Sequence, residues 1–165
     1  NRWIIDPIDG TSNFLNGIPQ FAISIAFEEQ GELTCGVIFD PIKNEMFFAE
    51  KNKGSFLNNQ RIRVSKRVNL EDCLVATSGK INKDYDFNYR KSGCAALDLA
   101  YVASGRLDGF FHNKINLWDV AAVKILIEEA GGKVNNINDF KINKIDIRAG
   151  NPNIYEKMLK KLDNF

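Results

Sequence analysis

Residues 3–14 read WIIDPIDGTSNF, and this segment carries the strongest information about both the fold and the chemistry of the chain. The apolar run at residues 3–5 predicts a short buried strand. Pro7 is expected to end that strand, because proline has no N–H for the hydrogen-bond ladder. Asp6 and Asp9 therefore stand at the exit of a strand, which is where open α/β sheets place their ligands.

The two carboxylates together with Pro7, Gly10 and Thr11, rather than the spacing alone, favour a cation site. Two anionic groups in a partly dry site repel each other unless a cation joins them. Hard oxygen ligands select Mg²⁺, which keeps positions open for water and a substrate phosphate. Gly10 lets the backbone approach a ligand, and a helical turn starting near Thr11 would offer N–H groups to phosphate. The alternative is an Asx turn followed by a helix N-cap, since Asp and Asn favour both.

A second informative segment lies far along the chain, where residues 118–122 read WDVAA and residues 128–132 read EEAGG. Apolar residues recur at helical spacing, which predicts a helix over 119–130 that the two glycines end. Asp119 falls in its first turn, where the helix dipole alone accounts for a negative charge. The functional interpretation is a third metal carboxylate. Ala121 and Ala122 indicate close packing around the start of this helix.

The remaining pattern predicts hairpins first and alternating elements later. Strands are expected at 21–27, 33–39, 45–50, 54–57, 74–77, 107–111, 133–137 and 146–149, with helices at 95–104 and after Asn151-Pro152. This order predicts an α/β fold, a layered α/β sandwich with mixed sheets, in a single domain spanning residues 1–165.

Composition excludes several classes of function. The chain has 165 residues, 44% of them hydrophobic, and 22 Lys+Arg against 21 Asp+Glu give a net charge of +1. This balance predicts no binding to nucleic acid or to an anionic membrane. The basic stretch at 61–67 is interpreted as the wet face of a strand. Three separated cysteines without a CxxC pair indicate a reducing, cytoplasmic location. The chain opens on Asn1 just before a strand, so we expect its true N-terminus to lie upstream.

The two segments together resemble signatures of the inositol monophosphatase family, DPxDGT and WDxAA…EAGG. Residues 93–98, GCAALD, are similar to the family segment that contacts substrate hydroxyls. The resemblance runs from Trp3 to about Asn151. It implies a Mg²⁺-dependent phosphatase that hydrolyses a small phosphorylated polyol or sugar with metal-activated water, binds up to three Mg²⁺ ions and forms a homodimer.

The resemblance also assigns roles by position. It implies metal binding by the carboxylates of Asp6, Asp9 and Asp119 and by the backbone carbonyl of Ile8. Asp9 and Thr11 are the implied catalytic residues, with the Thr11 hydroxyl helping to activate a water. The implied substrate contacts are Gly10, Thr11, Ser12, Gly93, Cys94, Ala95 and His112.

The chain departs from the family pattern at several points. The upstream Glu-Glu metal motif and the acidic partner of the threonine are missing from it, which leaves the activity of this chain by itself open. Ser12 replaces a commoner threonine. His112 stands where inositol-using relatives carry glutamate, and a surface imidazole is the alternative to a substrate contact. Cys94 replaces a small hydroxyl residue, and its alternative role is a packed side chain at a helix start.

Inositol 1-phosphate is the default substrate that the resemblance implies. The alternatives are fructose 1,6-bisphosphate, histidinol phosphate and 3′-phosphoadenosine nucleotides. The nucleotide is the less favoured of these, because no patch of aromatic and arginine residues near the motifs indicates an adenine pocket. A regulatory protein that keeps the fold and works through a protein partner is a hypothesis of a different class. A domain whose carboxylates only cap turns is a third.

Overall fold

The computed structural model describes residues 1–79, 81, 85, 87–135 and 144–162 of the chain. Its strands are β1 (Arg2–Asp9), β2 (Ala22–Glu29), β3 (Glu32–Asp40), β4 (Glu45–Glu50), β5 (Gly54–Leu57), β6 (Gln60–Arg61), β7 (Leu74–Ala76), β8 (Asn88–Arg90), β9 (Gly109–Asn116), β10 (Lys133–Val134) and β11 (Lys144–Gly150). Its helices are α1 (Thr11–Leu15), α2 (Ala95–Ala103), α3 (Leu117–Glu129) and α4 (Pro152–Leu162), with a 3₁₀ turn, η1, at Leu70–Asp72.

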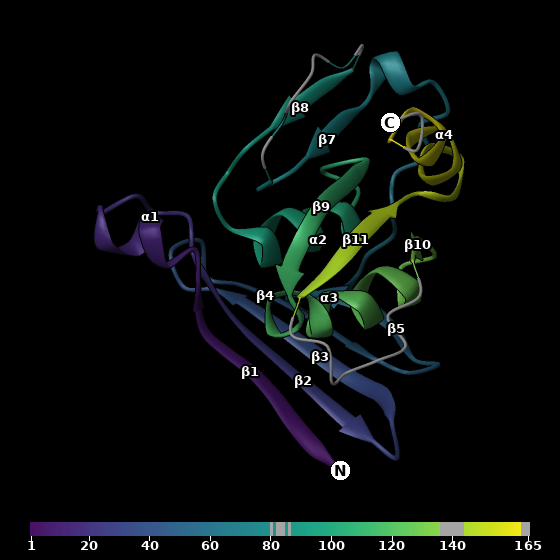
Figure 1. The fold of residues 1–165 in the computed structure, drawn as a ribbon. Helices are drawn as coiled ribbons and strands as arrows, with labels where there is room; N and C mark the ends of the chain where they lie inside the picture. The colour runs from purple at the N-terminus through teal and green to yellow at the C-terminus, as the bar shows by residue number, and fades with distance from the viewer. Residues whose placement is uncertain (80, 82–84, 86, 136–143, 163–165) are drawn as a thin grey trace.

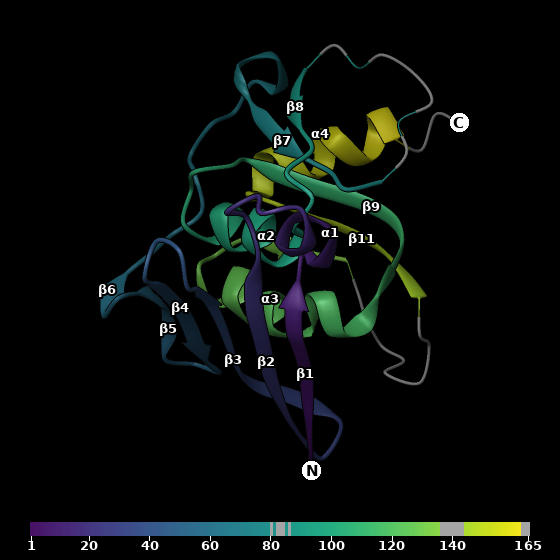
Figure 2. The same ribbon diagram turned by 90° about the vertical axis from the view of Figure 1, so that its left-hand side faces the viewer.

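The strands form two sheets with helices between them. The first sheet is antiparallel in the order β1 to β6, and the second has the order β10-β11-β9-β7-β8. In the second sheet β7 runs parallel to both β8 and β9, whereas β9, β10 and β11 are antiparallel. Figures 1 and 2 show α2 and α3 between the sheets and α4 beyond the second sheet. The predicted layered α/β sandwich is confirmed.

Small residues on the inner face of the first sheet let α3 pack closely against it. Ala22, Ser24 and Ala26 alternate with larger residues along β2 and are buried on this face. On β3, a Cβ added to Gly36 would lie only 2.5 Å from the carbonyl oxygen of Ala122 in α3. The sheet therefore needs glycine at this position, and the close packing predicted around the start of the helix is found.

The first strand differs from the prediction in two ways. Trp3 and Ile5 are 62% and 53% exposed, so β1 is not a buried strand, and Ile4 is the apolar residue of this run that packs against the core. The strand also continues past Pro7 to Asp9, with a register shift against β2 between Asp6 and Asp9. Because β1 is the edge of its sheet, one side needs no ladder partner, and proline is tolerated there and at bulges.

Other predicted boundaries hold to within a few residues, and the differences are mostly extensions. β9 runs on to Asn116 instead of ending at 111, and it leads directly into α3. The prediction at 133–137 is met by β10 at Lys133–Val134, while residues 136 and 137 lie outside the described residues. The basic stretch is a strand only at its first residue, Arg61. Its arginines are nevertheless exposed and alternate with partly buried Ile62 and Val64.

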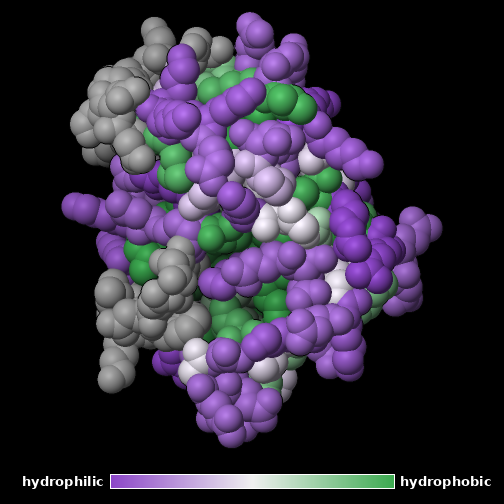
Figure 3. All heavy atoms as spheres, turned by 90° about the vertical axis from the view of Figure 1, so that its right-hand side faces the viewer, coloured by the Kyte–Doolittle hydropathy of each residue, from purple (hydrophilic) through white to green (hydrophobic). Residues whose placement is uncertain are grey.

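The last helix is amphipathic, with one apolar face turned toward the core. Ile154, Tyr155 and Met158 are buried, whereas the lysines of its last turns are exposed. The face of the molecule in Figure 3 correspondingly mixes many hydrophilic side chains with smaller apolar groups. None of the described helices combines the length and the apolar character needed to cross a membrane.

Candidate metal centre

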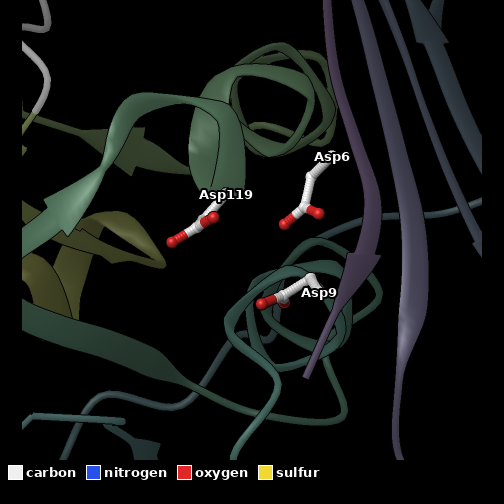
Figure 4. A group of neighbouring side chains, drawn as sticks. All are labelled: Asp6, Asp9 and Asp119. Carbon is white, nitrogen blue, oxygen red and sulfur yellow. The ribbon is translucent and has the colours of Figure 1, made fainter. Parts of the chain in front are cut away.

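Three aspartates from two distant segments meet in the structure. Asp6 and Asp9 lie on β1, and Asp119 lies in the first turn of α3. One carboxylate oxygen from each residue lies within 4.8 Å of the others, and Figure 4 shows the three side chains turned toward a common space. The structure thus brings together the three side chains predicted as metal ligands.

Local contacts hold each carboxylate in place. The bulge in β1 lets the backbone N–H of Ile8 donate to Asp6 Oδ1 at 3.0 Å. Asn116, the last residue of β9, donates from Nδ2 to Asp119 Oδ2 at 3.3 Å. The start of α3 is tied to the first sheet, because Ser24 Oγ lies 3.5 Å from the carbonyl oxygen of Trp118. The triad therefore depends on the packing of α3 against β2.

Two carboxylates of this cluster, those of Asp9 and Asp119, have raised pKa values. Burial, followed by the charges of Asp9 and Asp6, raises the pKa of Asp119 to about 7. Burial also raises the pKa of Asp9, although hydrogen bonds from the Ala96 N–H and the Cys94 thiol oppose this shift. Groups arranged so that their negative charges oppose one another are stabilised by a bound cation. The donor set consists of carboxylate oxygens, which fits a hard divalent ion such as Mg²⁺.

The turn after β1 joins two other predicted roles. The Thr11 hydroxyl donates to the carbonyl oxygen of Ile8 at 2.8 Å, so the implied catalytic hydroxyl contacts the implied metal-binding carbonyl. Gly10 has φ 85°, and a Cβ there would lie 2.9 Å from the carbonyl of Gln20, so both conformation and space require glycine. Helix α1 begins directly after Gly10, and its first N–H groups lack partners within the helix.

The segment predicted to contact substrate closes one side of the centre. The Ala96 N–H donates to Asp9 Oδ2 at 2.6 Å, and Cys94 Sγ lies 3.2 Å from the same oxygen. Ala95 is 4% exposed, and Gly93 has φ 83°. Residues 93–96 are therefore adjacent to the triad. Ser12, in contrast, is exposed on α1.

Sequence reasoning missed three polar residues that organise this region. The Nδ2 of buried Asn13 donates to the carbonyls of Gln20 and Ser92, which ties α1 to the loop before α2. Asn116 contacts Asp119 as described, and Asp98 is a 2% exposed carboxylate in the first turn of α2. Burial, assisted by the charge of Asp9, raises the pKa of Asp98 to about 7. Asp98 stood within the GCAALD segment, but nothing local distinguishes it from a helix-start acid.

His112 lies on β9, the strand that leads into α3. Burial lowers its pKa, which favours the neutral imidazole, and its buried Nδ1 has no hydrogen-bond partner among the described residues. A Cβ on Gly79 would be 3.6 Å from the His112 ring. Within the described residues, no hydrogen bond or ion pair joins this imidazole to the triad. Its predicted substrate contact stays a prediction.

Fold and site together define a layered α/β protein whose carboxylate triad could hold a metal ion. Residues 1–164 match the description "Inositol monophosphatase family", and the chain belongs to this family. The predicted family membership is confirmed, and the acidic triad is in keeping with a family that is generally metal-dependent.

Individual relatives carry two kinds of name. The chain is 40% identical to "Inositol-1-monophosphatase" of Mesorhizobium japonicum, covering 97% of the chain and 66% of the relative. It is also 40% identical to "Nus factor SuhB" of Escherichia coli K12, covering 96% and 66%. The crystal structure of extragenic suppressor protein suhB from Bartonella henselae superposes with a TM-score of 0.87 at 45% identity, covering 98% and 72%. The chain thus spans about two thirds of the length of these relatives.

Proposed function

We propose that this chain supplies the catalytic acidic centre of a Mg²⁺-dependent phosphatase that hydrolyses a small phosphate monoester. The observation that supports this proposal is the meeting of Asp6, Asp9 and Asp119 within 4.8 Å, with the pKa values of two of them raised. Repulsion between carboxylates destabilises a cluster with a purely structural role, whereas a bound cation offsets that repulsion.

The residues take distinct roles in this proposal. The three carboxylates and the Ile8 carbonyl hold the ion, and Gly10 and Thr11 face the phosphate. When bound, Mg²⁺ supplies Lewis acidity, lowers the pKa of a water and neutralises charge on the phosphate and the leaving oxygen. The Thr11 hydroxyl, 2.8 Å from the Ile8 carbonyl, orients the water that replaces the alcohol on phosphorus. Water and the phosphate monoester thereby give the free alcohol and inorganic phosphate.

Inositol 1-phosphate is the proposed substrate, with its hydroxyls near Ser12, His112 and the backbone of Gly93, Cys94 and Ala95, since the Cys94 side chain is 0% exposed. The presence of a relative called inositol-1-monophosphatase supports this choice. A neutral imidazole at 112 cannot supply the carboxylate that inositol-using relatives carry there. His112→Glu should therefore raise kcat/KM for inositol 1-phosphate relative to fructose 1,6-bisphosphate, histidinol phosphate and a 3′-phosphoadenosine nucleotide.

The direct test is release of phosphate from this substrate panel, measured with Mg²⁺, with EDTA and with added Li⁺. Wild type should release phosphate only with the divalent ion, and Asp9→Asn should abolish most of the release. Asp72→Asn, at an exposed aspartate of η1, is the matched control and should be silent. Unchanged release by Asp9→Asn would show that the proposed metal mechanism is wrong.

A regulatory role through a protein partner is the second candidate, since one relative is called a Nus factor. It is favoured if wild type binds Mg²⁺ but releases no phosphate from any compound of the panel. A homodimer and a cytoplasmic location belong to the same proposal. Sedimentation of the full-length protein tests the first of these.

A further inference from the structure

One oxygen of Asp9 receives two hydrogen bonds from the start of α2. The Ala96 N–H donates to Oδ2 at 2.6 Å, and the Cys94 thiol lies 3.2 Å from the same atom. A carboxylate offers about four lone-pair directions. Two donors on Oδ2 therefore fix the plane of the group and leave the remaining directions for a cation.

The thiol that makes this contact is itself held firmly. Cys94 is 0% exposed, and its backbone N–H donates to Ser92 Oγ at 3.1 Å. The Ser92 carbonyl in turn accepts from Asn13 Nδ2 at 2.9 Å. On the opposite side, a Cβ on Gly10 would lie 3.2 Å from Cys94 Cβ, so the cysteine packs directly beneath the turn that follows Asp9. Packing therefore fixes both Cys94 and the turn that follows Asp9.

We propose that Cys94 is a positioning residue, whose thiol orients the Asp9 carboxylate for the bound divalent cation. This inference rests on the proposed function and adds to it a role for a side chain that does not touch the ion. Without the thiol, one N–H holds Oδ2, and the carboxylate turns about its last side-chain torsion. Partners of metal ligands typically contribute 10- to 100-fold in metal affinity, so about a tenfold loss is expected.

A second buried cysteine shows what packing alone looks like. Cys73 is 1% exposed, lies in a separate apolar cluster, and directs its thiol to the carbonyl oxygen of Asn69 at 3.0 Å. Removing its sulfur leaves a comparable small cavity but no loose carboxylate. Cys73→Ala is therefore a matched control for the loss of a buried thiol.

The test is Mn²⁺ affinity, measured by electron paramagnetic resonance on the full chain, together with denaturant unfolding in EDTA. Cys94→Ala should bind Mn²⁺ about tenfold more weakly. Cys94→Ser keeps a donor and should restore affinity close to that of wild type, whereas Cys73→Ala should lose stability without losing affinity. Should Cys94→Ala fail to fold, Cys94→Val, which fills the space without a donor, replaces it.

The outcomes separate this inference from the proposed function. If wild type binds no Mn²⁺, the metal centre itself is wrong, and the role of Cys94 goes with it. If wild type binds Mn²⁺ and the Ala or Val variant binds equally well, the positioning role alone is overturned. A Cys94→Ser protein that binds Mn²⁺ as weakly as Cys94→Ala overturns it too, because the serine hydroxyl is a donor and should hold the Asp9 carboxylate.

Discussion

Asp108 is a buried and Asp119 a half-buried acidic residue, and they have opposite surroundings. Asp108 is 0% exposed and accepts hydrogen bonds from Ser65 Oγ, from Arg67 Nη1 at 3.0 Å and from the Leu74 N–H at 2.8 Å. Asp119 meets two further carboxylates and one amide donor. A carboxylate surrounded by donors stabilises the fold, whereas one surrounded by other carboxylates needs an ion from outside the chain.

The largest expected effect comes from removing a carboxylate of the Asp6, Asp9 and Asp119 triad. Asp119→Asn should lower Mg²⁺-dependent phosphate release about 1,000-fold, or about 4 kcal/mol, because the ion loses one of its three carboxylates. In EDTA the same variant should be as stable as wild type or more stable, since repulsion within the triad is relieved. Phosphate assays and urea unfolding check the two halves. A variant that loses stability in EDTA would show that Asp119 is a structural acid.

Removing the charge of Asp108, which is surrounded by donors, should instead reduce stability and leave metal binding unchanged. Asp108→Asn leaves the Leu74 N–H and the hydroxyl of Ser65 with a poorer acceptor, and should cost about 3 kcal/mol in the free energy of unfolding. Urea unfolding measures this loss directly. Mn²⁺ affinity of the folded fraction should equal that of wild type. An Asp108→Asn protein with weakened Mn²⁺ affinity but normal stability would contradict a structural role for Asp108.

The raised pKa values of Asp119 and nearby Asp98 also predict a pH dependence of stability that bound Mg²⁺ should reduce. Asp119 and Asp98 have pKa values raised to about 7, well above those of an unfolded chain. Between about pH 4 and about pH 7 the folded protein therefore holds protons that the unfolded chain has released, so its stability falls as pH rises through this window. Above about pH 7 both states are ionised and this contribution is flat.

Melting temperatures with EDTA and with saturating Mg²⁺ across that window provide the measurement. In EDTA the melting temperature should fall as pH rises, and Mg²⁺ should reduce the fall by stabilising the ionised carboxylates of the triad. Asp119→Asn should remove its own share of the dependence. A melting temperature that rises with pH in EDTA would contradict the raised pKa values.

The smallest expected effects come from replacing two glycines, one near the triad and one with open space around it. Gly93 and Gly131 both have positive φ, 83° and 84°, but a Cβ on Gly93 would lie 2.9 Å from Asn13 Nδ2, whereas Gly131 has open space. Gly131→Ala should cost about 1 kcal/mol for the left-handed conformation alone. Gly93→Ala should cost more and should also weaken Mn²⁺ binding, since Asn13 anchors the loop before α2. Equal costs would mean that Asn13 simply moves aside.

Much of the fold was predictable because it is encoded by local patterns. The alternation of small and large residues predicted β2 and its hairpin with β3, and helical spacing with terminal glycines predicted α2 and α3. The prediction for β1 was wrong in its burial and its end, since nothing in an apolar tripeptide tells an edge strand from a central one. The short strands β6 and β8 were not predicted, whereas β7 and β10, which are equally short, fell within predicted strands.

The same division applies to the candidate site. Asp6, Asp9 and Asp119 could be proposed from their motifs, but Asp119 taken alone was better explained by the helix dipole. Their meeting required the approach of α3 to the first sheet at Gly36. The bonds from Cys94 and Ala96 to Asp9 join residues far apart in sequence, so no spacing rule reveals them.

The sequence by itself determined the alternation of strands and helices and the residue types that bind hard cations, because both follow from the chemistry of near neighbours. The tertiary structure decided which acid is satisfied and which is not. Asp108 and Asp119 are the same residue type, and they behave differently because the chain surrounds one with donors and the other with carboxylates. That difference arises from contacts between distant segments, which are fixed only when the core packs.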